Sequence, residues 1–222
     1  MFRAPGLQCC RGRGWGGRPA RPRDGAVTRA KVQRRLAAIL AADVAGYSAL
    51  VAADEDGTLV QFADHLRGLI APLVSEHDGR IIKTTGDGLL AEFASVVSAL
   101  TCAIQVQAGM AERNADIEPE RRLEFRIGLH VADVVIDGGD IFGEGVNVAA
   151  RLEGLADPGG ICVSARVQED TQGRLEVEFD DLGEQTLKNM PRPVRVYAVR
   201  RQGAPARRTP LTVPDKPSIA VL

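Results

Sequence analysis

The sequence of 222 residues lacks several features that define common protein classes. Its four cysteines give no disulfide framework, because Cys9 and Cys10 adjoin each other near the N-terminus and Cys102 and Cys162 lie in apolar surroundings without metal-ligand spacing. No apolar run is long enough for a signal peptide or a membrane span, and no internal repeat is visible. These absences argue against a disulfide scaffold, a membrane protein and a repeat protein. We therefore expect a reducing, cytoplasmic location.

Positive charge is scarce after residue 35. Ten of the 28 Lys and Arg residues lie within residues 1–35, together with only one of the 29 acidic residues, Asp24. The rest of the chain keeps 18 basic and 28 acidic residues, a net charge of −10. Such an acidic body is a poor nucleic-acid surface, so we expect no nucleic-acid partner. Residues 1–33, rich in Gly, Pro and Arg, predict a disordered basic extension, with a nucleic-acid-binding arm as the alternative.

Ordered patterns of apolar residues begin near residue 34. The run "RLAAILAADVAGYSAL" resembles a buried strand that stops at Asp43 and turns through Gly46. Apolar residues at helical spacing predict an amphipathic helix over about 55–77, which Pro72 can bend, and a second helix from about residue 97. Between them, "RIIKTT", "GDG" and "LLAEFA" predict a β-hairpin.

The second half of the chain adds strands and one more helix. "LEFRIGLHVADVVID" predicts one long strand or a broken pair, and "VNVAARLEGLA" predicts a helix closed by "DPGG". Further short strands are expected at "ICVS", "LEVEFDDLG" and "PVRVYAV". This order predicts one α/β domain of the α+β type over residues 34–200, with a mixed sheet and helices mainly on one face. Residues 201–222 have linker composition and predict the start of a further C-terminal region.

Two groups of polar residues stand out at predicted element ends. Asp43 ends a strand and Asp87 lies in the hairpin turn, and if these elements are neighbours the two carboxylates meet at one edge of the sheet. Such a pair suits Mg²⁺ or Mn²⁺, although an aspartate in this kind of turn is most often structural. Asn147 and Arg151 are four residues apart on a predicted helix, where they could hold a sugar oxygen and a phosphate or simply face solvent.

Four segments in order, "AADVAGYS", "KTTGDGLLAEF", "DIFGEGVNVAARLEG" and "LKNMPRPVRVYAV", resemble the class III nucleotidyl cyclase catalytic domain, the family of adenylate and guanylate cyclases. The resemblance covers about residues 34–200 and is strongest to bacterial adenylate cyclases. It implies the nucleotide cyclase fold, with a ferredoxin-like, palm-type sheet. It also implies a phosphorus–oxygen lyase that converts ATP to 3′,5′-cyclic AMP and pyrophosphate at a homodimer interface.

The resemblance implies a role for each matching residue. Asp43 and Asp87 correspond to the aspartates that bind two Mg²⁺ or Mn²⁺ ions per site. Lys83 and Asp140 correspond to the pair that reads the purine, and their chemistry fits adenine rather than guanine.

Further matching residues imply contacts with the ribose and the phosphates. Asn147 and Arg151 correspond to the residues that orient the ribose and stabilise charge on the α-phosphate, and Lys188 to the lysine on the terminal phosphates. The segment around Gly46 enters a helix whose amides can receive the triphosphate. Because family members are head-to-tail dimers, the two metal aspartates of one subunit would face the other residues of its partner.

Two other functions are weighed against this one. "GGDIF" is similar to the signature of diguanylate cyclases, but Ile141 stands where that signature has an acid. A regulatory module that binds nucleotide or only dimerises is the second alternative, although such modules usually lose one of the matching residues. His130, alone in its predicted strand, is expected to be a packed or surface residue rather than a ligand or a base.

Overall fold

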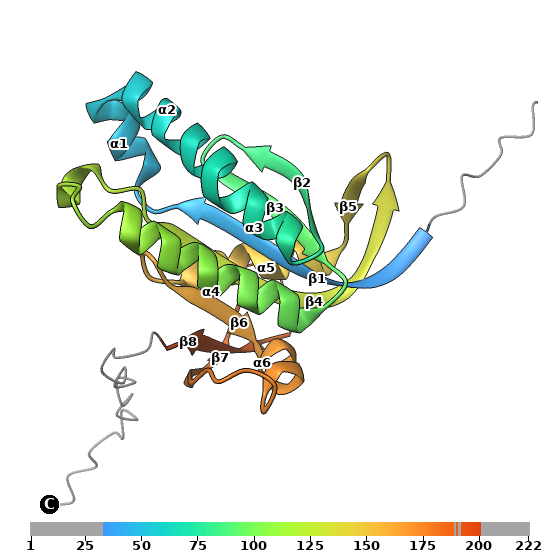
Figure 1. Ribbon diagram of the computed structural model, residues 1–222. Helices are drawn as coiled ribbons and strands as arrows, with labels where there is room; N and C mark the ends of the chain where they lie inside the picture. The colour runs from blue at the N-terminus through green and yellow to red at the C-terminus, as the bar shows by residue number, and fades with distance from the viewer. Residues whose placement is uncertain (1–32, 189, 191, 201–222) are drawn as a thin grey trace, which may run out of the picture. The chain divides into compact units, whose positions relative to one another are not determined.

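The structure, a computed structural model, describes residues 33–188, 190 and 192–200 (Figure 1). The basic extension expected over residues 1–33, apart from its last residue, and the linker expected over 201–222 lie outside this part of the chain. Within it, none of the helices combines the length and apolar character needed to cross a membrane.

One mixed sheet forms the centre of the domain. Its strands follow the spatial order β2-β3-β1-β4-β6-β8-β7, and β5 pairs with β4 beside this path. Only the pairing of β4 with β6 is parallel among the described strands. The strands are β1 (Gln33–Val44), β2 (Gly79–Thr85), β3 (Gly88–Phe93), β4 (Phe125–Asp137), β5 (Asp140–Phe142), β6 (Ile161–Ser164), β7 (Phe179–Gln185) and β8 (Val194–Val199).

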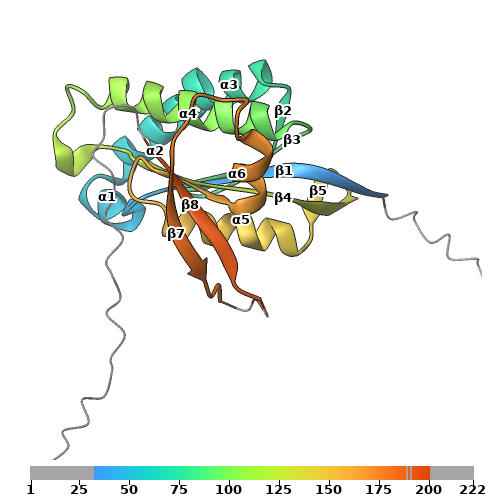
Figure 2. The ribbon, with the colours of Figure 1, turned by 90° about the horizontal axis from the view of Figure 1, so that it is seen from below.

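Helices cover both faces of the sheet unequally. Most of them pack on one face, whereas α5 lies on the opposite face (Figure 2). The predicted mixed sheet with helices mainly on one face is therefore confirmed. The helices are α1 (Tyr47–Ala53), α2 (Glu55–His65), the π-helix η1 (Leu66–Ile70), α3 (Ala71–Glu76), α4 (Val96–Arg113), the 3₁₀-helix η2 (Pro119–Arg121), α5 (Glu144–Leu155) and α6 (Ala165–Thr171).

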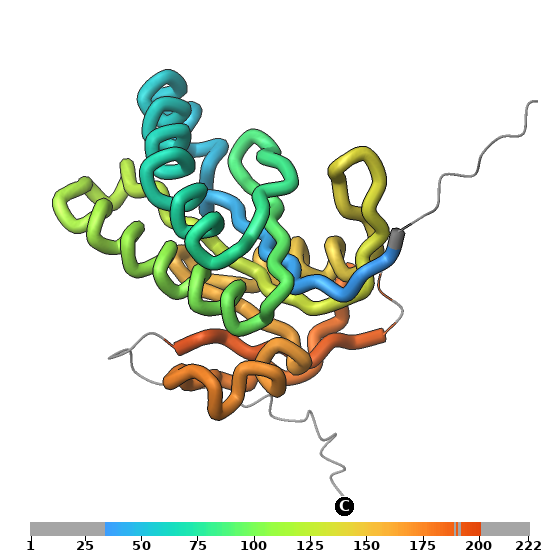
Figure 3. The backbone as a smooth tube through the Cα atoms, turned by 45° about the vertical axis from the view of Figure 1, so that its right-hand side comes forward, coloured from blue at the N-terminus to red at the C-terminus, as the bar shows by residue number. Residues whose placement is uncertain are grey.

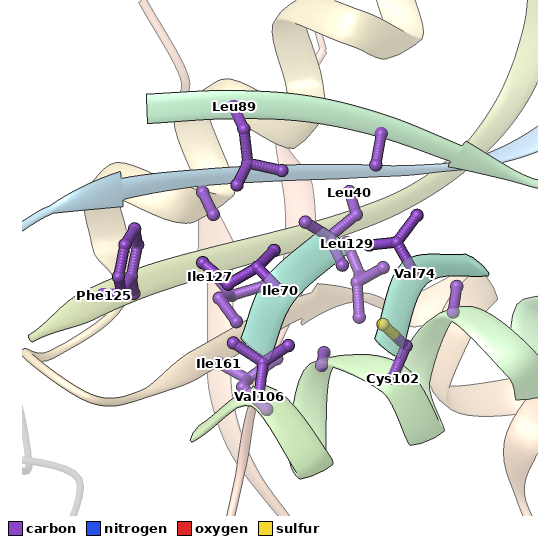
Figure 4. Packing of buried hydrophobic residues seen from close by; sticks show 14 of the residues in the cluster. Leu40, Ile70, Val74, Leu89, Cys102, Val106, Phe125, Ile127, Leu129 and Ile161 are labelled. Atoms are coloured by element: carbon purple, nitrogen blue, oxygen red, sulfur yellow. The ribbon is translucent and has the colours of Figure 1, made fainter. Parts of the chain in front are cut away.

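Residues 37–42 of β1 are buried on both faces of the sheet, which explains the unbroken apolar run in this part of the strand. Leu40 points into the larger core formed with α3 and α4, shown in Figure 4, and Ile39 points into the smaller core beneath α5. Both side chains are at most 3% exposed. Strands β3 and β4 pair with both edges of β1, and a core covers each face of the sheet there, so residues 37–42 do not alternate between core and solvent.

The helix predicted over 55–77 is present but contains a π turn. Pro72 has no backbone N–H, so it cannot donate to the carbonyl of Gly68 four residues earlier. Arg113 at the end of α4 takes that place, because its Nη2 donates to the Gly68 carbonyl at 2.8 Å. The backbone N–H of Ala71 instead reaches Leu66. The Arg113 side chain of another helix thus supplies the hydrogen bond that the Gly68 carbonyl cannot receive from Pro72.

His130 is half-buried on β4. Its Nδ1 lies 2.9 Å from the Ser164 hydroxyl oxygen at the end of β6. Burial, together with the charge of Arg166, lowers the pKa of His130 to about 4. Burial also lowers the pKa of His65, which contacts Arg113. Both histidines are therefore neutral in the folded protein at pH values where a histidine of the unfolded chain is already protonated.

We predict that this difference destabilises the protein in acid. The unfolded chain takes up the His130 proton below its ordinary pKa of about 6.5, whereas the folded chain does so only near pH 4, so stability falls as the pH drops between these values. The loss from His130 between pH 7 and pH 5 should be about 2 kcal/mol. Chemical unfolding of the wild type and of His130→Asn at both pH values measures it. An equal loss in both proteins would show that His130 does not cause it.

Candidate active site

The two predicted metal ligands lie next to each other at one edge of the sheet. Asp43 of β1 pairs with Gly88 of β3, and Asp87 directly precedes Gly88 in the hairpin turn. The backbone N–H of Val44 donates to the carbonyl of Asp87 at 3.0 Å. Gly86 makes the tight turn possible through its positive φ of 57°. The register of β1 against β3 thus places the two aspartates, 44 positions apart in the sequence, at one site.

Two charged residues that the sequence patterns did not single out complete this edge. Arg126 of β4 pairs with Asp43 across the strands, and its Nε donates to Asp43 Oδ1 at 2.9 Å while its Nη2 donates to Oδ2. The same Nη2 lies 3.5 Å from Oε1 of Glu153 on α5. Hydrogen bonding to Asp43 raises the pKa of Arg126, with contributions from the charges of Glu153 and Asp87. The edge therefore gathers three carboxyl groups around one guanidinium.

Glu153 has a strongly raised pKa. Burial is the main cause, and a hydrogen bond with Asp43 and the charge of Asp87 add to it, so that the pKa of Glu153 rises to about 8. Its side chain is only 14% exposed. The carboxyl group is thus held inside the domain, against β1 and β4, where losing its proton is costly.

The donors at this edge fit a divalent metal of the Mg²⁺ type. Asp43 and Asp87 offer hard carboxylate oxygens, and a guanidinium already lies on Asp43, so this position attracts positive charge. Among the described residues, no three His, Cys, Asp or Glu side chains are placed so that they could hold one metal ion together. A site with two carboxylates suits Mg²⁺ or Mn²⁺, which take their remaining ligands from water and phosphates.

The predicted purine-reading residues also come together. Lys83 of β2 and Asp140 at the start of β5 form an ion pair, with Lys83 Nζ 2.8 Å from Asp140 Oδ2 and 3.1 Å from Oδ1. The Lys83 ammonium also lies 5.9 Å from the centre of the Phe142 ring. The bond from Lys83 keeps the pKa of Asp140 below its ordinary value, helped by the Ile141 amide. The β2–β3 and β4–β5 hairpins that carry this pair project on the same side (Figure 3).

The remaining predicted residues lie on the surface of the domain. Asn147 and Arg151 are exposed on one face of α5, whereas Val148 and Leu152 on the other face are buried. Lys188 is exposed between β7 and β8. These three side chains are therefore open to a ligand or to a second subunit.

Gly46 joins β1 to helix α1. It has a φ of 67°, and its carbonyl accepts hydrogen bonds from Ala49 and Leu50. The predicted helix entry after Asp43 is present, and the first amides of α1 follow closely after Asp43 in the chain.

One glycine fixes the position of α5 on the sheet. A Cβ atom on Gly128 of β4 would lie 2.2 Å from the Ala149 carbonyl oxygen and 2.3 Å from the Glu153 backbone nitrogen. Helix and strand backbones therefore pack in direct contact here, two residues along β4 from Arg126. This close approach brings Glu153 to the aspartates and sets the direction of the exposed face of α5.

Comparisons with known proteins identify the family of the chain. The family profile described as "Adenylate and Guanylate cyclase catalytic domain" matches residues 31–201. A solved structure from Silicibacter pomeroyi, described as an adenylate/guanylate cyclase/hydrolase, is 47% identical, with a TM-score of 0.72, and the match covers 75% of this chain and 97% of that one. The chain belongs to the class III nucleotide cyclases, the family of adenylate and guanylate cyclase catalytic domains.

More particular relatives are bacterial. A protein of Rhizobium meliloti (strain 1021), provisionally named adenylate cyclase 3, is 43% identical over 197 residues, which make up 86% of this chain and 34% of that protein. An adenylate cyclase of Streptomyces coelicolor is 30% identical over 139 residues, or 63% of this chain and 35% of that protein. The chain thus spans about a third of the length of these two relatives. The adenylyl cyclase CyaB of P. aeruginosa, 21% identical with a TM-score of 0.68 over 81% of this chain and 98% of that one, shares the fold.

We predict that Gly128→Ala displaces α5. The added methyl group has no room against the helix backbone, and overpacking of this kind costs about 1–3 kcal/mol of stability. Gly154→Ala is the matched control, because a Cβ there meets no atom within 4 Å and alanine favours a helix. Thermal unfolding should show a lower midpoint for Gly128→Ala and an unchanged or higher one for Gly154→Ala. Equal midpoints for Gly128→Ala and the wild type would contradict the close packing.

Proposed function

We propose that this domain is an adenylate cyclase that converts ATP to 3′,5′-cyclic AMP and pyrophosphate. The observation that carries the proposal is the ion pair of Lys83 with Asp140, present in the same domain as the adjacent Asp43 and Asp87. The first pair suits an adenine base and the second suits the cations of a triphosphate. A family that includes both adenylate and guanylate cyclases supports the reaction type.

Lys83 and Asp140 match the hydrogen-bonding edge of adenine. An ammonium donates to a ring nitrogen, and a carboxylate accepts from the exocyclic amine. Guanine presents the opposite pattern at these positions, because it has a carbonyl and a ring N–H there. Both side chains are partly exposed, at 43% and 33%, so a base can reach them and exchange their mutual bond for its own.

Asp43 and Asp87 would hold two Mg²⁺ or Mn²⁺ ions. When bound, such ions lower the pKa of the ribose 3′-hydroxyl and neutralise the triphosphate. Arg126 adds a guanidinium fork beside these carboxylates, a geometry that suits phosphate oxygens. The amides after Gly46 are a further candidate for contacts with the triphosphate.

The exposed residues of α5 and Lys188 would serve the active site of a partner subunit in a homodimer. There Asn147 orients the ribose, Arg151 stabilises the charge that grows on the α-phosphate, and Lys188 holds the terminal phosphates. Loss of a group such as Arg151 should lower kcat by about 10²–10³-fold, as loss of an oxyanion donor does. The complete set of residues in one chain supports a dimer with two working sites.

Product analysis tests the substrate. Purified protein is incubated with Mn²⁺ and either ATP or GTP, and we expect cyclic AMP as the main product because Lys83 and Asp140 complement adenine. Cyclic GMP as the main product would contradict that reading of the pair. A cyclic dinucleotide from GTP would favour a diguanylate cyclase. No turnover by a verified dimer would favour a nucleotide-binding or dimerisation module.

Mixing two inactive variants tests the shared site. Asp43→Ala and Asn147→Ala should each be inactive alone, since each removes one half of both sites. After subunit exchange, half of the dimers would contain one intact site, which gives about one quarter of the wild-type activity. Activity is measured as cyclic AMP formed, and exchange is checked with differently tagged subunits. No recovery despite proven exchange would rule out sites built from two subunits.

A further inference from the structure

Helix α5 carries an acid that the proposed reaction does not use. Glu153 follows Arg151 by two positions and therefore lies on a different face of the helix. Arg151 is exposed, whereas the Glu153 side chain is 14% exposed and turned towards the sheet. One helix thus offers Asn147 and Arg151 outward and a carboxyl group inward, to the metal edge of its own chain.

Arg126 has two carboxyl partners at this edge, and it contacts them unequally. It makes two hydrogen bonds to Asp43 and a looser ion pair of 3.5 Å to Glu153. A guanidinium has five N–H donors in a planar fork, so it can serve both groups. The two bonds to Asp43, however, place a positive charge against both of the carboxylate oxygens that a divalent cation would need. Arg126 and the cation therefore compete for Asp43.

We infer that Glu153 is a positioning residue that holds Arg126 when Asp43 binds a divalent cation. The inference rests on the proposed function, because it takes Asp43 as a metal ligand. With Glu153 as acceptor, Arg126 leaves the oxygens of Asp43 and stays beside the site. Without the oxygens of Glu153, Arg126 keeps only Asp43 of these two partners, and it then obstructs the binding of the cation to Asp43.

The packing of α5 makes this arrangement specific. The direct contact at Gly128 fixes the Glu153 backbone over β4, which keeps its side chain within reach of Arg126. Asp43 and Arg126 are held opposite each other by the pairing of β1 with β4. The backbones of all three residues are therefore held in place, and a change of partner by Arg126 requires only a rotation of its side chain.

Binding of Mn²⁺ to the full chain, without nucleotide, measures the effect directly. The paramagnetic resonance signal of free Mn²⁺ gives the affinity independently of turnover. Glu153→Gln keeps the size of the side chain but replaces one of its two oxygens by an amide N–H₂ group, which cannot accept a hydrogen bond from Arg126. It should weaken Mn²⁺ binding roughly tenfold, the usual cost of losing a group that orients a ligand. Glu169→Gln, an exposed change on α6, is the matched control and should bind as the wild type does.

A double-mutant cycle separates positioning from simple attraction between Glu153 and the cation. In an Arg126→Gln background, Glu153→Gln should have no further effect on Mn²⁺ affinity, because the residue through which it acts is gone. The same tenfold loss in that background would overturn the inference, and so would wild-type affinity in Glu153→Gln alone. If Glu153→Gln does not fold, Glu153→Asp takes its place in the cycle, with a smaller loss that also disappears without Arg126.

The outcome also distinguishes this inference from the proposed function. Asp43→Ala should abolish the binding, which shows that the measured ion occupies the proposed site. A wild-type protein that binds no Mn²⁺ would remove both the proposed metal site and this inference. A wild type that binds Mn²⁺ and forms cyclic AMP, combined with an indifferent Glu153→Gln, would overturn the inference alone.

Discussion

The register of β1 between β3 and β4 is the constraint on which the site depends. Asp43 pairs with Gly88 on one side and with Arg126 on the other. Because side chains alternate between the two faces of a strand, a shift by one residue would move Ile39 and Leu40 into each other's cores. The two cores on opposite faces of β1 therefore fix the register, and the register brings the acidic and basic groups together. The register of β1 thus determines both the packing of the two cores and the arrangement of the charged side chains.

Much of this arrangement could be predicted from the sequence because it depends on local patterns. A Gly-Asp-Gly turn between two strand-like runs predicts a hairpin. That hairpin carries Asp87 in its turn, next to the end of β1. Helical periodicity gave α4 and α5, and therefore the shared face of Asn147 and Arg151. The contact of Lys83 with Asp140 joins two hairpins far apart in the sequence, and only the family resemblance indicated it.

Other features had no local signal. Arg126 is one polar residue in a strand of alternating polar and apolar residues. Its contacts depend on Asp43, which β1 places opposite it. Glu153 resembles a surface residue at the end of a helix, and its burial depends on the contact of α5 with Gly128. The π turn before Pro72 needs Arg113 from α4, and the seven residues of α6 are too few for a periodic pattern. In each case the deciding partner is distant in sequence.

The acidic character of the sheet edge at Asp43, Asp87 and Glu153 is difficult to explain by stability alone. Burial and the neighbouring carboxylates raise the pKa of Glu153 to about 8, so the fold disfavours its ionised form. An uncharged residue of similar size at this position would avoid that cost, and buried ionic groups seldom stabilise a protein more than well-packed neutral ones do. Asp43 and Asp87 outnumber the single guanidinium of Arg126, and an added cation would offset this difference. Binding of a cation therefore explains these acidic side chains better than the stability of the fold does. A conflict between stability and function is expected at a site that binds a charged ligand.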